Sequence, residues 1–252
     1  MNKRFRLLAF LSVLLLTTMA CSITRRTPTP PPVSEGEDQK VQVTEVRQLV
    51  EFTKIDMDGG AKVILVQGNQ HSIAVEGSRR VVDQVVTEVK DGVLDIHYRD
   101  RDLFENWSER LTLTITFTNL SEFILDGGAE LKADNLSLED LNIVINGGAS
   151  VRMNNLLTNS LSMSLSGGGD IHIDGVAENQ TINVSGGTNY QAEDLKSANV
   201  SVEIGGAANV VVWATETLNL DLAGAYSVSY WGSPQITQSI GGIGQVKALG
   251  EK

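Results

Sequence analysis

The fold is decided by the stretch 145–171, INGGASVRMNNLLTNSLSMSLSGGGDI, in which a polar residue followed by two glycines occurs twice, 20 residues apart. The same short pattern, in places degenerate, recurs along most of the chain, starting at Asp58, Asp126, Asn146, Ser166, Ser185, Gly205, Ala223 and Gly241. From Asp126 onward, successive starts are 18–20 residues apart. A constant period of about 20 residues is typical of a solenoid, in which each repeat buries its apolar face only against its neighbours.

Apolar residues recur in phase with the glycines. One column lies just before the glycine pattern and is aliphatic in seven repeats: Leu125, Ile145, Leu165, Val184, Ile204, Leu222 and Ile240. A second column lies six residues after the first: Leu131, Val151, Ile171, Tyr190, Val210, Val228 and Val246. A third column holds for four repeats: Leu136, Leu156, Val176 and Leu195. Columns of this kind are expected when strands stack with one face turned inward.

These patterns predict an all-β, single-domain parallel β-helix (solenoid) of about seven to eight rungs, each 18–20 residues long. Strands of successive rungs should pair about 4.8 Å apart, with the apolar columns inside. The two glycines should form a tight corner, where a Cβ would clash or φ must be positive. A β-prism and a two-sheet sandwich are the alternatives, but both predict turns at irregular spacing.

The first 40 residues are expected to lie outside this fold. Residues 1–20 combine a basic start with the apolar run 7–16, which is typical of an export signal. Cys21 follows directly, as in a bacterial lipoprotein signal, where the cysteine becomes the lipidated first residue. An ordinary secretory signal with an incidental cysteine is the alternative. Residues 21–40 are proline-rich and then acidic, which predicts an extended tether.

Residues 41–252 should form the folded domain, with regular rungs over 119–252. The part from 41 to 118 is less regular, and we interpret it as an N-terminal β-meander joined to a first rung. Its expected strands cover 63–66, 72–75, 93–98 and 111–117. Asp91-Gly92 predicts a hairpin turn, and residues 79–86 fit either a short helix or a strand.

The charge and the cysteine content restrict the partners and the location. The formal net charge is −11, and removal of residues 1–20, which hold three basic and no acidic residues, lowers it to −14. An acidic surface repels phosphate backbones, so nucleic acid is not expected as a partner. With Cys21 as the only cysteine, an intrachain disulfide is excluded. We expect a lipid-anchored, extracytoplasmic protein of the bacterial cell envelope.

Several of these motifs together resemble a known bacterial family. They are the export signal, the strand that continues into Asp58-Gly59-Gly60-Ala61-Lys62-Val63, the hairpin Asp91-Gly92-Val93-Leu94-Asp95-Ile96, and the later Gly-Gly-Ala rungs. The family is described as "putative auto-transporter adhesin, head GIN domain", and the resemblance covers roughly residues 49–235. It implies an exported β-helical protein, and it brings no catalytic residues that could be assigned here.

One candidate metal or acid–base site lies on a single strand. Asp170, His172 and Asp174 alternate along the chain, so all three side chains should lie on one face. The alternative is an outward strand face with paired charges. The adjacent rung places Arg152 beside His172, where its positive charge would compete with a metal cation. We favour this alternative and expect no metal and no cofactor.

A second candidate site is aromatic. Trp213 and Trp231 are 18 residues apart and should stack on adjacent rungs, with Tyr226 and Tyr230 nearby. Exposed aromatic stripes can serve as platforms for sugar rings or proteins. The alternative is that these rings pack over the corner where the third apolar column ends.

The sequence therefore predicts a non-enzymatic envelope lipoprotein with a β-helical binding, adhesion or structural domain whose ligand is unknown. The alternative is a polysaccharide-active enzyme on the same scaffold. Expected partners are the membrane, through the lipidated Cys21, and a glycan or surface protein. The terminal rung, 241–249, has almost no chain left to cover it, which predicts contact with a partner or a second copy.

Overall fold

The computed structural model describes residues 41–99 and 111–252, so the predicted signal, Cys21 and tether lie outside the described residues. The described residues belong to one compact unit, 34–252. This unit contains every described strand and the hydrophobic core, so it holds what it needs to fold by itself. Its described residues are nearly all β, with one short helix, α2 (Arg79–Val82).

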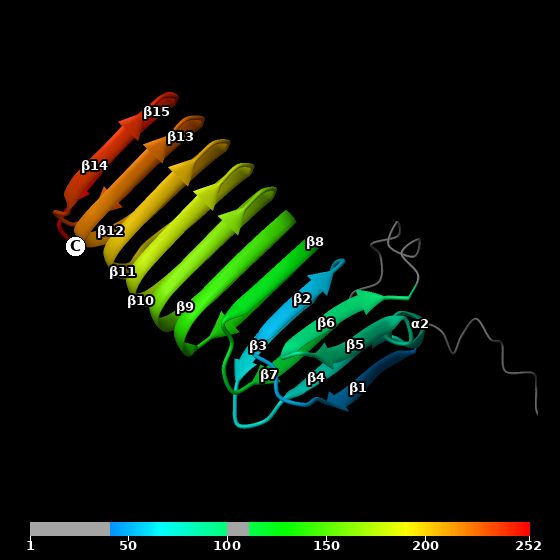
Figure 1. Ribbon diagram of the computed structural model, residues 1–252. Coiled ribbons are helices and arrows are strands. Elements are labelled where there is room, and N and C mark those ends of the chain that lie inside the picture. The colour runs from blue at the N-terminus through cyan, green and yellow to red at the C-terminus, as the bar shows by residue number, and fades with distance from the viewer. Residues whose placement is uncertain (1–40, 100–110) are drawn as a thin grey trace, which may run out of the picture. The chain divides into compact units, whose positions relative to one another are not determined.

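The larger part of this unit is the predicted solenoid of stacked strands (Figure 1). Its strands are β8 (Glu122–Asp134), β9 (Ser137–Leu165), β10 (Gly168–Val184), β11 (Gly187–Ile204), β12 (Ala207–Leu222), β13 (Ala225–Trp231), β14 (Gln235–Ile240) and β15 (Ile243–Gly250). All of their mutual pairings are parallel. The solenoid makes about six turns. The glycine pattern counts more rungs than this because the Asp58 copy lies in the N-terminal part and β15 begins a turn that is not completed.

The first two predicted columns form the inside of the solenoid. Ile171 pairs in register with Val151 on one side and with Tyr190 on the other, and all three are buried. The third column is wrong at one position, since Val176 is 48% exposed. A register shift between Ile173 and Gly175 is the reason: it puts Gly175, instead of Val176, opposite the buried Leu156.

The glycine corners stack directly on one another. Gly147, Gly167, Gly186, Gly206, Gly224 and Gly242 form one column. A Cβ added to Gly167 would lie 1.8 Å from the carbonyl oxygen of Gly147, well inside van der Waals contact. The corner therefore accepts only glycine because the backbones of adjacent rungs approach too closely for any side chain.

The N-terminal part joins a first turn to antiparallel strands. β2 (Lys54–Asp58) and β3 (Lys62–Gln67) pair parallel with β8, and β6 (Val93–Tyr98) and β7 (Thr112–Phe117) continue the two sheets beyond them. β1 (Gln42–Gln48) and β4 (Ser72–Ser78) close one sheet in antiparallel fashion. β5 (Val85–Lys90) forms a hairpin with β6. As predicted, Asp91 and Gly92 form its turn, both with positive φ (51° and 78°).

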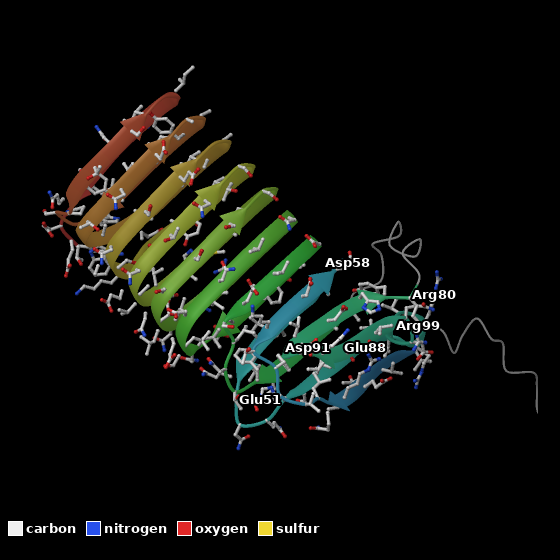
Figure 2. The ribbon with its side chains drawn as sticks, in the orientation of Figure 1. Glu51, Asp58, Arg80, Glu88, Asp91 and Arg99 are labelled. Carbon is white, nitrogen blue, oxygen red and sulfur yellow. The ribbon has the colours of Figure 1, made fainter. Side chains whose placement is uncertain are left out.

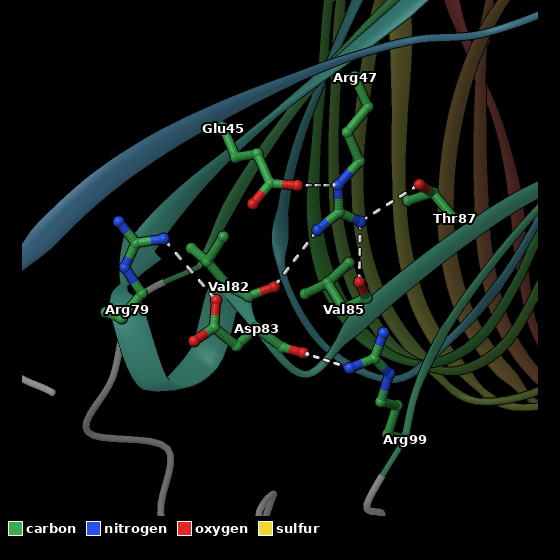
Figure 3. A network of polar contacts seen from close by, with 8 residues as sticks. All are labelled: Glu45, Arg47, Arg79, Val82, Asp83, Val85, Thr87 and Arg99. Atoms are coloured by element: carbon green, nitrogen blue, oxygen red, sulfur yellow. Dashed lines mark hydrogen bonds and ion pairs between the residues drawn. The ribbon is translucent and has the colours of Figure 1, made fainter.

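Arg47 covers the open strand edges at this end (Figure 3). Its guanidinium donates hydrogen bonds to the carboxylate of Glu45 (2.7 Å) and to the backbone oxygen of Val85 (2.7 Å). It also reaches the hydroxyl of Thr87 (3.2 Å) and the backbone oxygen of Val82 (3.4 Å). One charged side chain on β1 therefore occupies a backbone acceptor of β5 and one of α2, which hinders the pairing of another strand with this edge.

Candidate binding surface

A single column of large side chains runs along one side of the solenoid. In register from rung to rung it contains Leu157, Val176, Lys196, Trp213 and Trp231, which we call the side column. Leu157 and Val176 are 46% and 48% exposed, and the two tryptophans are half-buried. Four steps of about 4.8 Å give the column a length of about 19 Å. Reasoning from the sequence found the two tryptophans but missed the rest, because the register shifts near Gly175 and Lys196 hide the alignment.

Trp213 is held in place by two lysines. The ammonium groups of Lys196 and Lys252 lie 5.7 Å and 5.2 Å from its ring centroid, within the range of cation–π attraction. Lys252 also donates to the carboxylate of Asp194 and to the backbone oxygen of Glu193. These contacts fasten the residues after β15 to the side of β11, so Trp213 contributes to packing as well as to the surface.

The two tyrosines of the predicted aromatic site lie further inside. Tyr226 is only 8% exposed and belongs to the core, and Tyr230 is half-buried against that core. For these two residues the structure therefore favours the packing interpretation. Trp231, the last residue of the side column, is half-buried like Trp213.

Asp170, His172 and Asp174 lie on one face of β10, as the alternation predicts. The carboxylate of Asp170 accepts a hydrogen bond from the Asn189 side chain (3.0 Å), and that of Asp174 accepts one from the backbone N–H of Asn155 (2.6 Å). Within residues 41–99 and 111–252, no group of three or more His, Cys, Asp or Glu side chains is placed to hold a metal ion. The arrangement is that of an outward strand face.

A shallow groove of about 200 Å³ follows the glycine corner. Its polar lining consists of hydroxyl and amide side chains with one carboxylate, namely Asn146, Ser164, Ser166, Asn183, Ser185 and Glu203. Hydrolysis of a glycosidic bond requires two carboxyl groups flanking the bond. The groove, with Glu203 alone, has hydrogen-bonding capacity but lacks that pair.

Acidic residues crowd on the outer face where β2, β6 and β8 meet, a cluster that sequence reasoning missed. Asp56 stands opposite Asp95 across β2 and β6, and Asp58, at the end of β2 (Figure 2), stands opposite Asp126 across β2 and β8. Partial burial, followed by repulsion from Asp95 and Asp126, raises the pKa of Asp56. The nearby Glu122 has a lowered pKa because it accepts hydrogen bonds from Lys54 and Asn142. Only pairing across strands, which the sequence does not reveal directly, brings these groups together.

The family described as "Putative auto-transporter adhesin, head GIN domain" matches residues 51–234, which is most of the chain and includes β2 to β13. The chain belongs to this family. The resemblance predicted from the glycine corners and the Asp91-Gly92 hairpin is thereby confirmed. The family's description, an adhesin, is that of a cell-surface protein.

Solved structures of similar proteins have the same fold. A protein described as a putative adhesin from Bacteroides fragilis is 25% identical, with a TM-score of 0.79, and the match covers 83% of this chain and 98% of that one. A putative lipid binding protein from Parabacteroides distasonis is 20% identical (TM-score 0.64, covering 82% and 96%). A putative adhesin from the same species is 17% identical (TM-score 0.63, covering 84% and 98%).

No curated protein matches the chain. In the part of the chain that the structure describes, no helix has the length and apolar character needed to cross a membrane.

Proposed function

We propose that the protein is a non-enzymatic adhesin of the bacterial envelope, anchored by lipidated Cys21, which binds a glycan or surface protein along its side column. The observation that carries the proposal is the register of Leu157, Val176, Lys196, Trp213 and Trp231. Rigid strands hold these side chains at fixed spacing on one line, so a ligand meets a surface that is already organised and loses little binding energy to ordering it.

The chemistry of the column suits an extended, partly apolar ligand. Tryptophan rings stack on the apolar faces of sugars or on apolar side chains of a protein. Lys196, at the middle of the column, adds a positive charge on an otherwise acidic protein, whose formal net charge is −11. A ligand that carries acidic groups would therefore be attracted to the column more than to the surrounding surface. We expect Trp231 to make the main contact, because Lys196 and Lys252 already engage the ring of Trp213.

The alternative, a polysaccharide-active enzyme, is favoured by one observation, the polar groove that contains Glu203. Incubating residues 34–252 with the polysaccharides on a glycan array separates the two functions. Binding without release of reducing ends supports the adhesin, and an increase in reducing ends that Glu203→Gln abolishes would overturn it.

The side column is tested on the same array with Trp213→Ala and Trp231→Ala together. We expect binding to fall below detection while the Tm drops by only a few degrees, because both side chains are only partly buried. Val46→Ala with Val50→Ala is the matched control, since it removes exposed apolar surface from the N-terminal end. Unchanged binding by the tryptophan variant would exclude the column as the site.

The lipid anchor is tested separately from binding. Cells that express the full chain should incorporate labelled palmitate into it, and Cys21→Ser should abolish the label and release the protein from the membrane fraction. A labelled Cys21→Ser chain, or an unlabelled wild-type chain, would contradict the anchor without affecting the binding proposal.

A further inference from the structure

We propose that the C-terminal rung, formed by β14 and β15, is a homophilic interface through which two copies of this chain meet end to end. The proposal goes beyond ligand binding by the side column and does not depend on it. Its first basis is open backbone. Among the described strands, β14 pairs only with β12 and β15 only with β13, so each has one edge with free N–H and C=O groups. Such edges are templates for pairing with another strand.

The second basis is apolar surface that continues the core. Ile236 and Ile240 stand in register with Leu218 and Leu222, which are fully buried because the last rung covers them. No described rung covers Ile236 and Ile240, and they are 39% and 48% exposed. Ile243, 86% exposed, lies in the outward-facing column of Ala225 and adds a large apolar side chain beside this end.

The third basis is charge, which selects a second copy as the occupant. The chain is strongly acidic, yet residues 235–250 contain a single charged residue, Lys247. Two copies therefore meet with the least repulsion at this end. The N-terminal end differs, because Glu45 and Arg47 lie on β1 and Arg47 already occupies a backbone acceptor of β5. Stacking of the C-terminal rung of one copy on the N-terminal end of the next would bury these charges, so contact between two C-terminal rungs is favoured.

Symmetry then fixes the geometry. A two-fold axis that lies in the plane of the contact and perpendicular to the strands reverses their direction, so strands of the two copies pair in antiparallel fashion. Such a contact uses the same surface on both copies and closes at the dimer, whereas head-to-tail stacking would continue into a fibre. β15 is eight residues long, or about 26 Å at 3.3 Å per residue. With two sheets about 10 Å apart and their side chains, the end face is about 500 Å² per copy, or about 1,000 Å² in total.

An interface of this size is at the lower limit for specific association, so we expect a weak dimer in solution. The arrangement gives it a use. β1 lies at one end of the folded unit and β14 and β15 at the other (Figure 1). Contact between two C-terminal rungs therefore puts the β1 strands of the two copies at opposite ends of the dimer. If copies on two cells meet in this way, many weak contacts in parallel hold the cells together by avidity.

The test compares three forms of residues 34–252 by analytical ultracentrifugation over a concentration series. The wild type should shift from monomer to dimer, and Ile236→Lys with Ile240→Lys should weaken dimerisation at least tenfold. Val46→Lys with Val50→Lys is the matched control, because these two residues are also apolar and exposed (60% and 68%) but lie at the N-terminal end, outside both the side column and the C-terminal rung. It should dimerise like the wild type. Circular dichroism confirms that both variants are folded, and if Ile236→Lys with Ile240→Lys is not, Ile236→Thr with Ile240→Thr replaces it.

A second measurement tests the contact between surfaces without using the lipid anchor. Beads that carry the protein through a biotin at residue 34 should cluster with the wild type and with the control, and should not cluster with the Ile236 and Ile240 variant. A strictly monomeric wild type, equal dimerisation by all three forms, or the formation of fibres would overturn the proposal. Loss of palmitate labelling with intact bead clustering would instead remove only the membrane anchor.

Discussion

Replacement of Gly186 by alanine should destabilise the protein far more than replacement of its neighbour Gly187. Gly186 belongs to the stacked corner column, and an added Cβ would lie 1.9 Å from the carbonyl oxygen of Gly167. Gly187 has nothing within 4 Å of an added Cβ, and Ala207 already occupies the same column on the next rung. The two substitutions are chemically identical, so any difference in stability reports the corner alone.

The size of the effect follows from this distance. Real Cβ atoms essentially never approach within 3.0 Å of another heavy atom, so the corner must open by about 1.1 Å. That movement strains the hydrogen bonds from Ser185 N to Leu165 O (3.0 Å) and from Gly187 N to Gly167 O (3.1 Å). One or two weakened bonds at about 1 kcal/mol each, with about 1–3 kcal/mol for overpacking, give a loss of about 2–5 kcal/mol. For Gly187→Ala we expect the free energy of unfolding to be unchanged or to rise by up to about 1 kcal/mol, because alanine restricts the unfolded chain.

The assay is urea unfolding of residues 34–252, followed by circular dichroism, with the free energy taken from the midpoint and slope. A loss of about 2–5 kcal/mol corresponds to a drop in Tm of roughly 5–15 °C for a domain of this size. Equal stabilities of Gly186→Ala and Gly187→Ala would refute the stacked corner and, with it, the register on which the side column depends.

The remaining predictions concern the interior and the acidic cluster. Ile171→Asp should prevent folding because it puts an unpaired carboxylate in the core. Val176→Asp, on the outer face of the same strand, should change the free energy of unfolding by less than about 1 kcal/mol. A folded Ile171→Asp chain in gel filtration and circular dichroism would contradict this. Tyr190→Phe should lower the free energy of unfolding in urea by about 1–3 kcal/mol, because the buried Gln180 amide donates to the Tyr190 hydroxyl (2.8 Å) and would lose this acceptor. An unchanged unfolding midpoint would contradict that hydrogen bond. The pKa of Asp56 is raised in the folded state, so its charged form disfavours folding when the pH is above the ordinary pKa of 3.8. Asp56→Asn should therefore raise the Tm at pH 7. This gain in Tm should disappear as the pH falls below 3.8. A gain that persists in acid, or a loss at pH 7, would be inconsistent with this sign.

The sequence alone predicted the solenoid, because two properties of a parallel stack are visible in the chain itself. The backbones of adjacent rungs approach so closely at the corner that only glycine fits, and glycine therefore recurs at regular spacing as Gly147, Gly167 and Gly186. Inward stacking demands aliphatic columns, and Val151 and Ile171 appear at the same phase. Both signals repeat, so an error at one rung leaves the fold prediction intact.

The candidate surface was predicted less completely, because it depends on where the repeat is irregular. The shift at Gly175 turned Val176 outward, and a second one places Lys196 beside Trp213. Counting at a fixed offset cannot detect either shift. The contacts of Lys252 with Asp194 and Trp213 join residues that are far apart in the chain, so no local sequence pattern predicts them.

The most direct test of the proposed adhesin is the binding of fluorescently labelled residues 34–252 to intact bacterial cells over a range of concentrations. The account predicts saturable binding by the wild type. It also predicts that Trp213→Ala with Trp231→Ala abolishes this binding, while Val46→Ala with Val50→Ala preserves it and both variants remain folded. Saturable binding of equal strength by the wild type and the tryptophan variant would contradict the side column as the adhesive surface.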